Sequence, residues 1–279
     1  MSATRQRLER FVRASAGEWN RIGEQTAFYA KTLGESTEAV RKYRVELTRL
    51  IAQMGLGVGA LALVGGAVVV VSFVVMGASS VVAIVGYSQF SNLSLEALIG
   101  FFSAYVNPRL VSPLIAAIGL AITIGAGATA QLGAMRINEE MDALEVMGIR
   151  AIAYLASTRV IAGVIVVIPL FCVSLIAGIV TTQMVVLVSF GQSVGVYEHY
   201  FNTFLRPTDV IWALVQVTVQ GTVIMLVCTY YGFNATGGPA GVGEATGRAV
   251  RAALVAATTV TMIVGMILYG RSGGFNLTG

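Results

Sequence analysis

The chain has 279 residues, of which 56% are hydrophobic and 11% are charged, and its mean hydropathy is +0.79. Soluble domains carry about 25% charged residues and need polar side chains to cover their surface, so this composition excludes a soluble globular enzyme. Lipid, in contrast, tolerates apolar side chains all round a helix. We therefore predict an all-α, polytopic integral membrane protein.

The net charge of +4 and the isoelectric point near 9.2 come from basic residues at the N-terminus and at the ends of apolar segments. Binding to nucleic acid requires a basic patch on a soluble face, and the sequence offers no such patch. We expect no nucleic-acid partner. The basic residues instead predict how the chain is oriented in a membrane.

Residues 1–50 contain ten of the eighteen Lys and Arg residues and no apolar run typical of a cleavable signal peptide. Apolar residues recur here at helical spacing in two groups: Trp19, Ile22, Tyr29 and Leu33, then Val40, Tyr43, Leu47 and Leu50. A break is expected at residues 34–37, with Ser36 or Thr37 as a new N-cap. We predict amphipathic helices of the cytoplasmic interface over 1–50 and a transmembrane domain over 51–279. A solvated helix that packs on a soluble partner is the alternative.

A helix needs about 20 predominantly apolar residues to cross a bilayer. Five segments meet this requirement: residues 54–78, 110–134, 158–187, 210–232 and 250–270. A further apolar patch at residues 93–106 ends at Asn107-Pro108 and is too short to span alone. It is either a re-entrant or interfacial piece or an N-terminal extension of the second span.

The basic residues predict the orientation of these five transmembrane helices, because connections rich in Lys and Arg stay in the cytoplasm. The N-terminus and the 135–157 and 233–249 connections are expected inside, and the 188–209 loop and the C-terminus outside. Basic residues near the inner connections outnumber those near the outer ones: Arg136, Arg150, Arg159, Arg248 and Arg251 against Arg109, Arg206 and Arg271. We expect a multi-pass protein of the inner (plasma) membrane.

The segment 136–149 is the only acidic cluster after the N-terminal region, and it separates two spans on the predicted cytoplasmic side. Three apolar residues share one face of the expected helix: Ile137, Met141 and Leu144. Three acids lie near its N-terminus, where the helix dipole favours negative charge: Glu139, Glu140 and Asp142. Gly148 is a natural C-terminal stop. Such a helix either docks a soluble partner or is an ordinary charged loop that sets topology.

Other residue types that could carry chemistry are isolated. His199 is the only histidine and makes a poor metal site without further ligands, and nothing orders it with Asp209 and a serine into a catalytic triad. Cys172 and Cys228 lie in apolar runs and are expected to be reduced packing residues. The Gly-rich segment 237–243 predicts a tight loop and lacks the Lys-Ser/Thr of a phosphate-binding loop. We expect no enzyme activity, catalytic residue, cofactor or metal.

The run Glu139-Glu140-x-Asp142-Ala143-Leu144-x-x-Met147-Gly148 resembles the hallmark of the MlaE/YrbE family of ABC lipid-transport permeases. Residues 125–135, Tyr154-Leu155, Thr158-Arg159 and a second block from Tyr230 to Val250 fit the same pattern in order. The segments 23–29 and 274–277 resemble, more narrowly, the "B" YrbE subunit of actinobacterial Mce systems. Together these matches cover most of residues 50–270.

The resemblance implies one of two permease subunits of a lipid importer, paired with a related YrbE "A" chain. A cytoplasmic ABC ATPase would hydrolyse the ATP and dock on a coupling helix at about 136–149, and MCE-domain proteins would form a conduit on the outer face. The residues implied to couple the ATPase to the membrane are Arg136, Glu139, Glu140, Asp142, Ala143, Leu144, Met147 and Gly148.

The chain departs from the MlaE pattern where that family has charged positions in the second span, because Leu110, Thr123 and Gln131 stand there. An apolar lipid cavity lined by the first, second and fifth spans is therefore implied by analogy, for fatty or mycolic acids or sterols. The departures leave a second hypothesis open, a membrane scaffold that assembles MCE proteins without transporting lipid. An ion channel is disfavoured, since no ring of charged or carbonyl-rich residues is evident.

Overall fold

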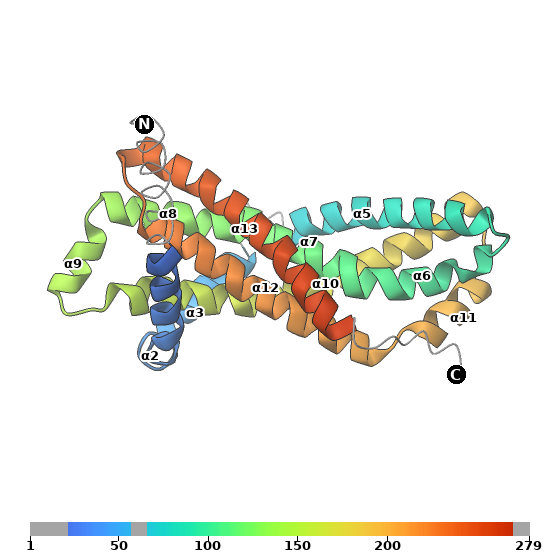
Figure 1. Cartoon of the computed structure of the whole chain (residues 1–279), viewed down its shortest axis with the longest axis horizontal. Helices are drawn as coiled ribbons and strands as arrows, with labels where there is room; N and C mark the ends of the chain where they lie inside the picture. The colour runs from blue at the N-terminus through green and yellow to red at the C-terminus, as the bar shows by residue number, and fades with distance from the viewer. Residues whose placement is uncertain (1–21, 57–65, 270–279) are drawn as a thin grey trace, which may run out of the picture.

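The computed structural model describes residues 22–56 and 66–269, and these form an elongated bundle of helices without strands (Figure 1). Trp19, Arg271 and the 274–277 motif lie outside the described residues. Residues 22–34 are helical. The labelled helices are α2 (Ser36–Lys42), α3 (Arg44–Leu56), α5 (Gly66–Ser91), α6 (Ile99–Val106), α7 (Ser112–Gly119), α8 (Ala126–Ile137), α9 (Glu140–Val146), α10 (Thr158–Phe190), α11 (Val194–Phe204), α12 (Pro207–Phe233) and α13 (Gly238–Tyr269).

Five helices in the described part of the chain are long and apolar enough to cross a membrane, which confirms the predicted all-α polytopic fold. They run over Gly66–Ser91, Glu96–Ile137, Ile152–Phe190, Pro207–Phe233 and Gly238–Ile267. The predicted edges were wrong in two places. The expected start of the first span at residue 54 lies in α3, and residues 57–65 are outside the description. The predicted tight loop at 237–243 is largely the first turn of α13.

The patch at 93–106 is an N-terminal extension of the second span. A 3-10 turn (Glu96–Leu98) leads into α6, and wider π-helical segments at Asn107–Val111 and Leu120–Gly125 join α6, α7 and α8 into one continuous span. Pro108 has no N–H to donate, and local π-helical widening is a known way to keep such a helix continuous. The break expected at Asn107-Pro108 therefore does not occur.

Helices α10 and α12 form the centre of the main core. Leu170 and Phe171 of α10 and Ile224 and Met225 of α12 are fully buried in one cluster. α13 crosses the bundle obliquely on its outside (Figure 1), and 11% of its most apolar stretch is buried, against 50% for α12. The last span therefore offers most of its apolar surface to lipid or to another protein.

Helices α8 and α12 approach each other closely at Gly232. A Cβ at this position would lie 2.8 Å from the carbonyl oxygen of Thr129. The Thr129 hydroxyl donates to the carbonyl oxygen of Cys228 across the same contact, at 3.0 Å. Small residues allow such close backbone approach within membranes. Cys228 is buried as expected, whereas Cys172, predicted to pack, is exposed on α10.

The end of the bundle away from α9 is formed by α5, α6, α10 and α11, and it contains a buried polar network. The Asn107 amide donates to Ser103 Oγ at 3.1 Å and Thr182 Oγ1 at 3.0 Å, and its oxygen accepts from Ser79 at 3.3 Å. Tyr197 of α11 donates to Ser103 at 2.8 Å. Burial raises the pKa of Tyr197 to about 12, so the hydroxyl stays protonated. Side chains from three helices therefore satisfy the hydrogen-bonding groups of the Asn107 amide.

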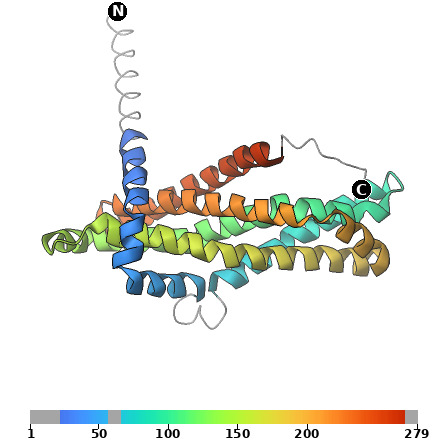
Figure 2. The same cartoon turned by 90° about the horizontal axis from the view of Figure 1, so that it is seen from below.

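The N-terminal helices lie across the bundle instead of apart from it (Figure 2). Residues 22–42 run as helix with one turn at Glu35, and the chain bends at Tyr43 into α3. The predicted cap at Ser36 or Thr37 is wrong, because Ser36 opens α2 and its hydroxyl donates back to the Thr32 carbonyl at 3.0 Å. Phe28 packs on Phe233 with ring centroids 5.5 Å apart. These helices therefore contact the end of α12.

Candidate functional site

The segment 136–149, where a coupling helix was expected, forms a loop that projects from one end of the bundle, between α8 and the third span (Figure 1). The single helix expected over 136–149 is two elements: α8 continues to Ile137, and α9 begins at Glu140 after a left-handed Glu139 with φ 59°. Arg136 therefore belongs to the end of the span. The last turn of α8 keeps its backbone hydrogen bonds through Ile137, so the chain changes direction only at Glu139.

The end of α9 follows the expectation for Gly148, which has φ +74°. The Gly148 N–H donates to the Glu145 carbonyl at 3.0 Å, and the Ile149 N–H donates to the Leu144 carbonyl at 2.9 Å. This pair of bonds is the Schellman arrangement, which needs a left-handed residue and favours glycine. The exit from α9 is therefore well defined by the backbone.

The inner face of α9 is fixed to the bundle by one buried methionine. Met141 is 1% exposed and packs with Leu132 of α8 and Leu155 of the third span, with Leu144 beside them. Met141 and Leu144 thus share the buried face that the sequence predicted, whereas Ile137 lies on α8. Burial of one such side chain is worth roughly 1.5–3 kcal/mol. This contact joins α9 to two membrane spans.

The outer face of α9 combines acids with apolar side chains. Seven of the eight predicted site residues are exposed and Leu144 is half-buried; the exposed ones are Arg136, Glu139, Glu140, Asp142, Ala143, Met147 and Gly148. The sequence analysis left out Val146, which is 89% exposed. Arg136 pairs with Asp142 at 3.0 Å. Val146 and the neighbouring Met147 therefore place two exposed apolar side chains among the acids of α9.

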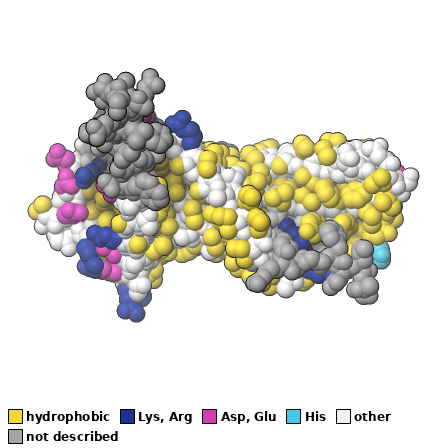
Figure 3. All heavy atoms as spheres, viewed as in Figure 1, with side chains coloured by type: hydrophobic (Ala, Val, Ile, Leu, Met, Phe, Trp, Pro, Cys, Tyr) yellow, Lys and Arg dark blue, Asp and Glu magenta, His cyan; other side chains and the backbone are white. Residues whose placement is uncertain are grey.

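Figure 3 shows the charged side chains gathered at the end of the bundle that includes α9, with apolar side chains over the rest of this face. The acids Glu140 and Asp142 lie in the first turn of α9, where the helix dipole stabilises them. The arrangement places an exposed acidic helix, α9, beside a bundle whose surface is mainly apolar. It contains no group arranged for bond-making chemistry.

The N-terminal helices brace the exit from α9, a contact that the sequence analysis missed. Arg150 forms an ion pair with Glu38 of α2. Tyr43 packs edge-on against Tyr154 with ring centroids 5.0 Å apart, and the Ser157 hydroxyl donates to the Thr32 carbonyl at 2.8 Å. No spacing in the sequence links residues so far apart. Residues 32–43 therefore contact the segment that follows α9.

Tyr29 shows how closely the same N-terminal segment is packed. Its ring lies edge-on to Tyr230 of α12 with centroids 6.0 Å apart. Burial, followed by the nearby ionisable Tyr231, Tyr230 and Cys228, raises the pKa of Tyr29 to about 12. The phenol is therefore neutral at physiological pH, as a tyrosine seated between helices must be.

An apolar hollow of about 560 Å³ lies between the second and fifth spans. Leu110 and Leu114 form one wall, and Met262 and Met266 lie on the other. Of the three spans expected to line a lipid cavity, the second and fifth line this hollow and the first does not. Leu110, one of the positions that departs from the MlaE pattern, is 50% exposed here.

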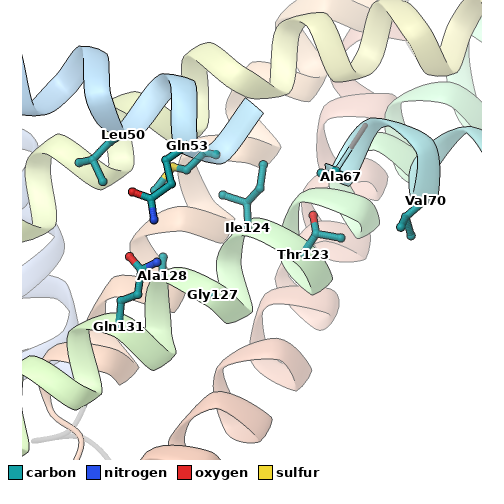
Figure 4. A pocket seen from close by; sticks show the side chains of 11 residues that line it. Leu50, Gln53, Ala67, Val70, Thr123, Ile124, Gly127, Ala128 and Gln131 are labelled. Carbon is teal, nitrogen blue, oxygen red and sulfur yellow. The ribbon is translucent and has the colours of Figure 1, made fainter. Parts of the chain in front are cut away.

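A second cavity, of about 340 Å³, lies between α3, α5 and the second span (Figure 4). Its lining includes Thr123 and Gln131, the two other positions that depart from the MlaE pattern, together with Gln53. The sequence analysis did not foresee a cavity beside α3. Nothing in the apolar run around Met54 distinguishes a lining residue from the start of a span.

The second span also contains a paired charge. The Arg109 guanidinium lies 2.8 Å from the Asp209 carboxylate and stacks over the Tyr105 ring at 4.0 Å. Asp209 follows Pro207, which begins α12. His199 is exposed on α11 and contacts the Tyr200 ring at 5.4 Å. In the described residues, no three His, Cys, Asp or Glu side chains are grouped to hold a metal ion.

The fold and this site define a multi-pass helical membrane protein in which a short helix, α9, lies between the second and third spans. Residues 58–267 match the family described as Permease MlaE. The chain belongs to this family of ABC transporter permeases.

Three relatives illustrate the breadth of the match. The chain is 30% identical over 185 residues to the Arabidopsis thaliana protein TRIGALACTOSYLDIACYLGLYCEROL 1, chloroplastic, which covers 66% of this chain and 53% of the relative. It is 32% identical over 190 residues to a probable ABC transporter permease protein of Rickettsia bellii, covering 65% and 70%. It is 30% identical over 241 residues to a similar protein of Rickettsia felis, covering 83% and 90%. The chain therefore spans about half of the Arabidopsis relative and most of the Rickettsia ones.

Proposed function

We propose that this chain is a permease subunit of an Mce-type ABC lipid importer, most like the YrbE "B" subunit. It moves fatty or mycolic acids or sterols across the inner membrane, with ATP hydrolysed by a separate cytoplasmic ATPase. The chain itself makes and breaks no covalent bond in this scheme. Its partners are a related YrbE "A" permease, the ATPase, and MCE-domain proteins on the outer face.

The observation that supports coupling is the two-sided packing of α9. Its outer face offers Glu140, Val146 and Met147 to a partner, and its inner face is fixed through Met141 to two spans. A force on the exposed side chains is therefore transmitted to α8 and to the third span. An ordinary topogenic loop would need no buried anchor.

A lipid cargo is supported by the two cavities and by one relative. Both cavities have mainly apolar walls along the second span, and apolar pockets with few polar groups suit hydrophobic ligands. The Arabidopsis relative bears the name of a galactosyl diacylglycerol lipid. The exposed apolar side chains of α13 suit a second permease subunit, since Met262 and Met266 are each more than 60% exposed.

The proposed orientation places α9 and the N-terminus in the cytoplasm and the C-terminus outside. The basic residues support it, because Lys and Arg side chains gather with the acids at the end of the bundle that includes α9 (Figure 3), and Arg136 and Arg150 flank α9 in the sequence. At the other end, α11 and its exposed His199 would face the MCE proteins.

The test starts from a tagged chain purified from native membranes in mild detergent, with co-purifying proteins identified by mass spectrometry. Recovery of a second permease, an ATPase and MCE proteins is expected. Absence of an ATPase even after crosslinking would overturn the proposed coupling role.

A charge reversal on α9 separates transport from the scaffold hypothesis. Glu140→Lys should abolish ATP-dependent lipid uptake while the chain still assembles with its outer-face partners. Glu198→Lys, an exposed acid on α11 at the opposite end, is the matched control and should keep ATPase coupling. Unchanged uptake and ATPase recovery in Glu140→Lys would favour a scaffold.

A further inference from the structure

The cavity between α3, α5 and the second span is distinct from the hollow beside α13. The two share no lining residue. Thr123, on the wall of the α3-side cavity, is nine residues beyond Leu114 of the other hollow, which is roughly 13 Å along a helix at 1.5 Å per residue. The two cavities therefore lie at different positions along the second span.

Small residues create the α3-side cavity. The lining includes Gly66 and Ala67 of α5 and Gly127 and Ala128 of α8, so both helices contribute little side-chain bulk to its walls. A Cβ built at Gly127 would meet no other atom within 4 Å. Gly232 differs, because atoms of α8 occupy the space beside it where α12 meets α8. The space at Gly127 is therefore available to a ligand.

Two amides stand across this cavity. Figure 4 shows Gln53 of α3 and Gln131 of α8 pointing toward one another. Neither side-chain amide forms a hydrogen bond with another described residue. Gln131 is exposed and Gln53 is half-buried. Each amide can donate and accept hydrogen bonds. Two amides beside an apolar cavity suit a ligand that has one polar head and one apolar tail.

The lining also limits which head and tail fit. Among the described residues the lining includes no Lys, Arg, Asp or Glu, so a charged phosphate head would find no cationic partner there. The volume of about 340 Å³ is near the lower end of the roughly 300–1,000 Å³ of ligand pockets. One narrow chain fits better than the two chains of a phospholipid.

We propose that this cavity binds a single-chain lipid whose uncharged head donates and accepts hydrogen bonds, held by Gln53 and Gln131. The cavity lies on the half of the second span that leads to α9. Its last lining residue there, Gln131, is six residues before the end of α8 at Ile137. It therefore serves lipid on the coupling-helix side of the membrane. This assignment of the side rests on the proposed orientation, whereas binding itself does not.

Binding is tested on the purified full chain with two photoactivatable probes of the same acyl chain, a monoacylglycerol and a lysophosphatidic acid. Crosslinked peptides are then mapped by mass spectrometry. The monoacylglycerol should label α3 and the 120–137 segment, and excess unlabelled monoacylglycerol should compete. The lysophosphatidic acid should label these peptides at least tenfold less.

Variants of the lining make the test specific. Gly127→Leu should fill the cavity and lower labelling at least tenfold, whereas Gly247→Leu, at another glycine with open space around its Cβ, should not. Gln53→Leu and Gln131→Leu should each weaken monoacylglycerol binding about fivefold, as expected for one neutral hydrogen bond. Thermal unfolding of each variant confirms that it is folded.

The outcomes distinguish the site from the transport function. Labelling that is unchanged in Gly127→Leu would overturn the site, and equal labelling by both probes or no effect of either Gln→Leu change would overturn head recognition. Specific labelling in a chain that recovers no ATPase would keep the site and remove the proposed function. Transport that persists in a Gly127→Leu chain would show that the cargo does not pass through this cavity.

Discussion

Met141 offers the sharpest test of how α9 is held. Met141→Ala removes a side chain that is 1% exposed and packed on Leu132 and Leu155. Substitutions of buried Met by Ala cost about 2–5 kcal/mol. Leu144 lies beside the gap and can partly fill it, so we expect a value near the lower limit, ~2 kcal/mol.

That cost should appear locally, because α9 contacts the bundle mainly through this face. At 1.4 kcal/mol per factor of ten, ~2 kcal/mol corresponds to a roughly 30-fold larger opening constant. Hydrogen exchange of the purified chain, followed by mass spectrometry, measures it directly. Amides of Glu140–Val146 should exchange about 30-fold faster in Met141→Ala, while amides of α10 and α12 keep their protection.

The matched control is Met147→Ala, the same substitution on the opposite face of the same segment. Met147 is 66% exposed, so its truncation should change exchange by less than about twofold, as for most surface substitutions. It should weaken ATPase recovery instead. Equal exchange in both variants would refute the two-sided packing of α9 on which the coupling proposal depends.

Three other predictions concern the rest of the bundle. Gly232→Ala should lower stability by about 1–3 kcal/mol through overpacking against α8, whereas Gly247→Ala, with open space around it, should raise the melting temperature slightly. Asp209→Asn breaks the ion pair with Arg109 and should cost about 1–3 kcal/mol in detergent unfolding, less than a fully buried pair because both groups keep some exposure. Tyr197→Phe should cost about 1 kcal/mol. Because folding raises the pKa of Tyr197 from 10 to about 12, wild-type stability should be full below pH 10 and fall between pH 10 and 12, and this fall should be smaller in Tyr197→Phe.

The number of spans was predictable because each is an apolar run long enough to cross a bilayer. Their edges were not. The apolar face of α3, which includes Leu50 and Met54, merges in sequence with the following span. Asn107-Pro108 indicates a break, yet the amide of Asn107 is satisfied by Ser103, Thr182 and Ser79, so tertiary contacts keep the helix continuous.

The candidate site was predictable where local chemistry marks it. Acids near a helix start and a glycine at its end located α9, and its buried face at Met141 and Leu144 followed from helical spacing. The brace between Glu38 and Arg150 depends on how the N-terminal helices cross the bundle, which no local pattern contains. The α3-side cavity likewise depends on how α3, α5 and the second span are placed around it, which no local pattern contains.

The unequal lengths of the spanning helices have a consequence for the surrounding lipid. At 1.5 Å per residue, the 33 residues of α10 extend ~50 Å and the 27 residues of α12 ~40 Å, against a hydrocarbon thickness of about 30 Å. A flat bilayer matches neither helix along its full length, and the excess is larger for α10 than for α12. The lipid must therefore thicken around α10, or α10 must tilt or emerge farther than α12, at a modest cost per ångström of mismatch. A change in bilayer thickness is therefore expected to affect α10 more than α12.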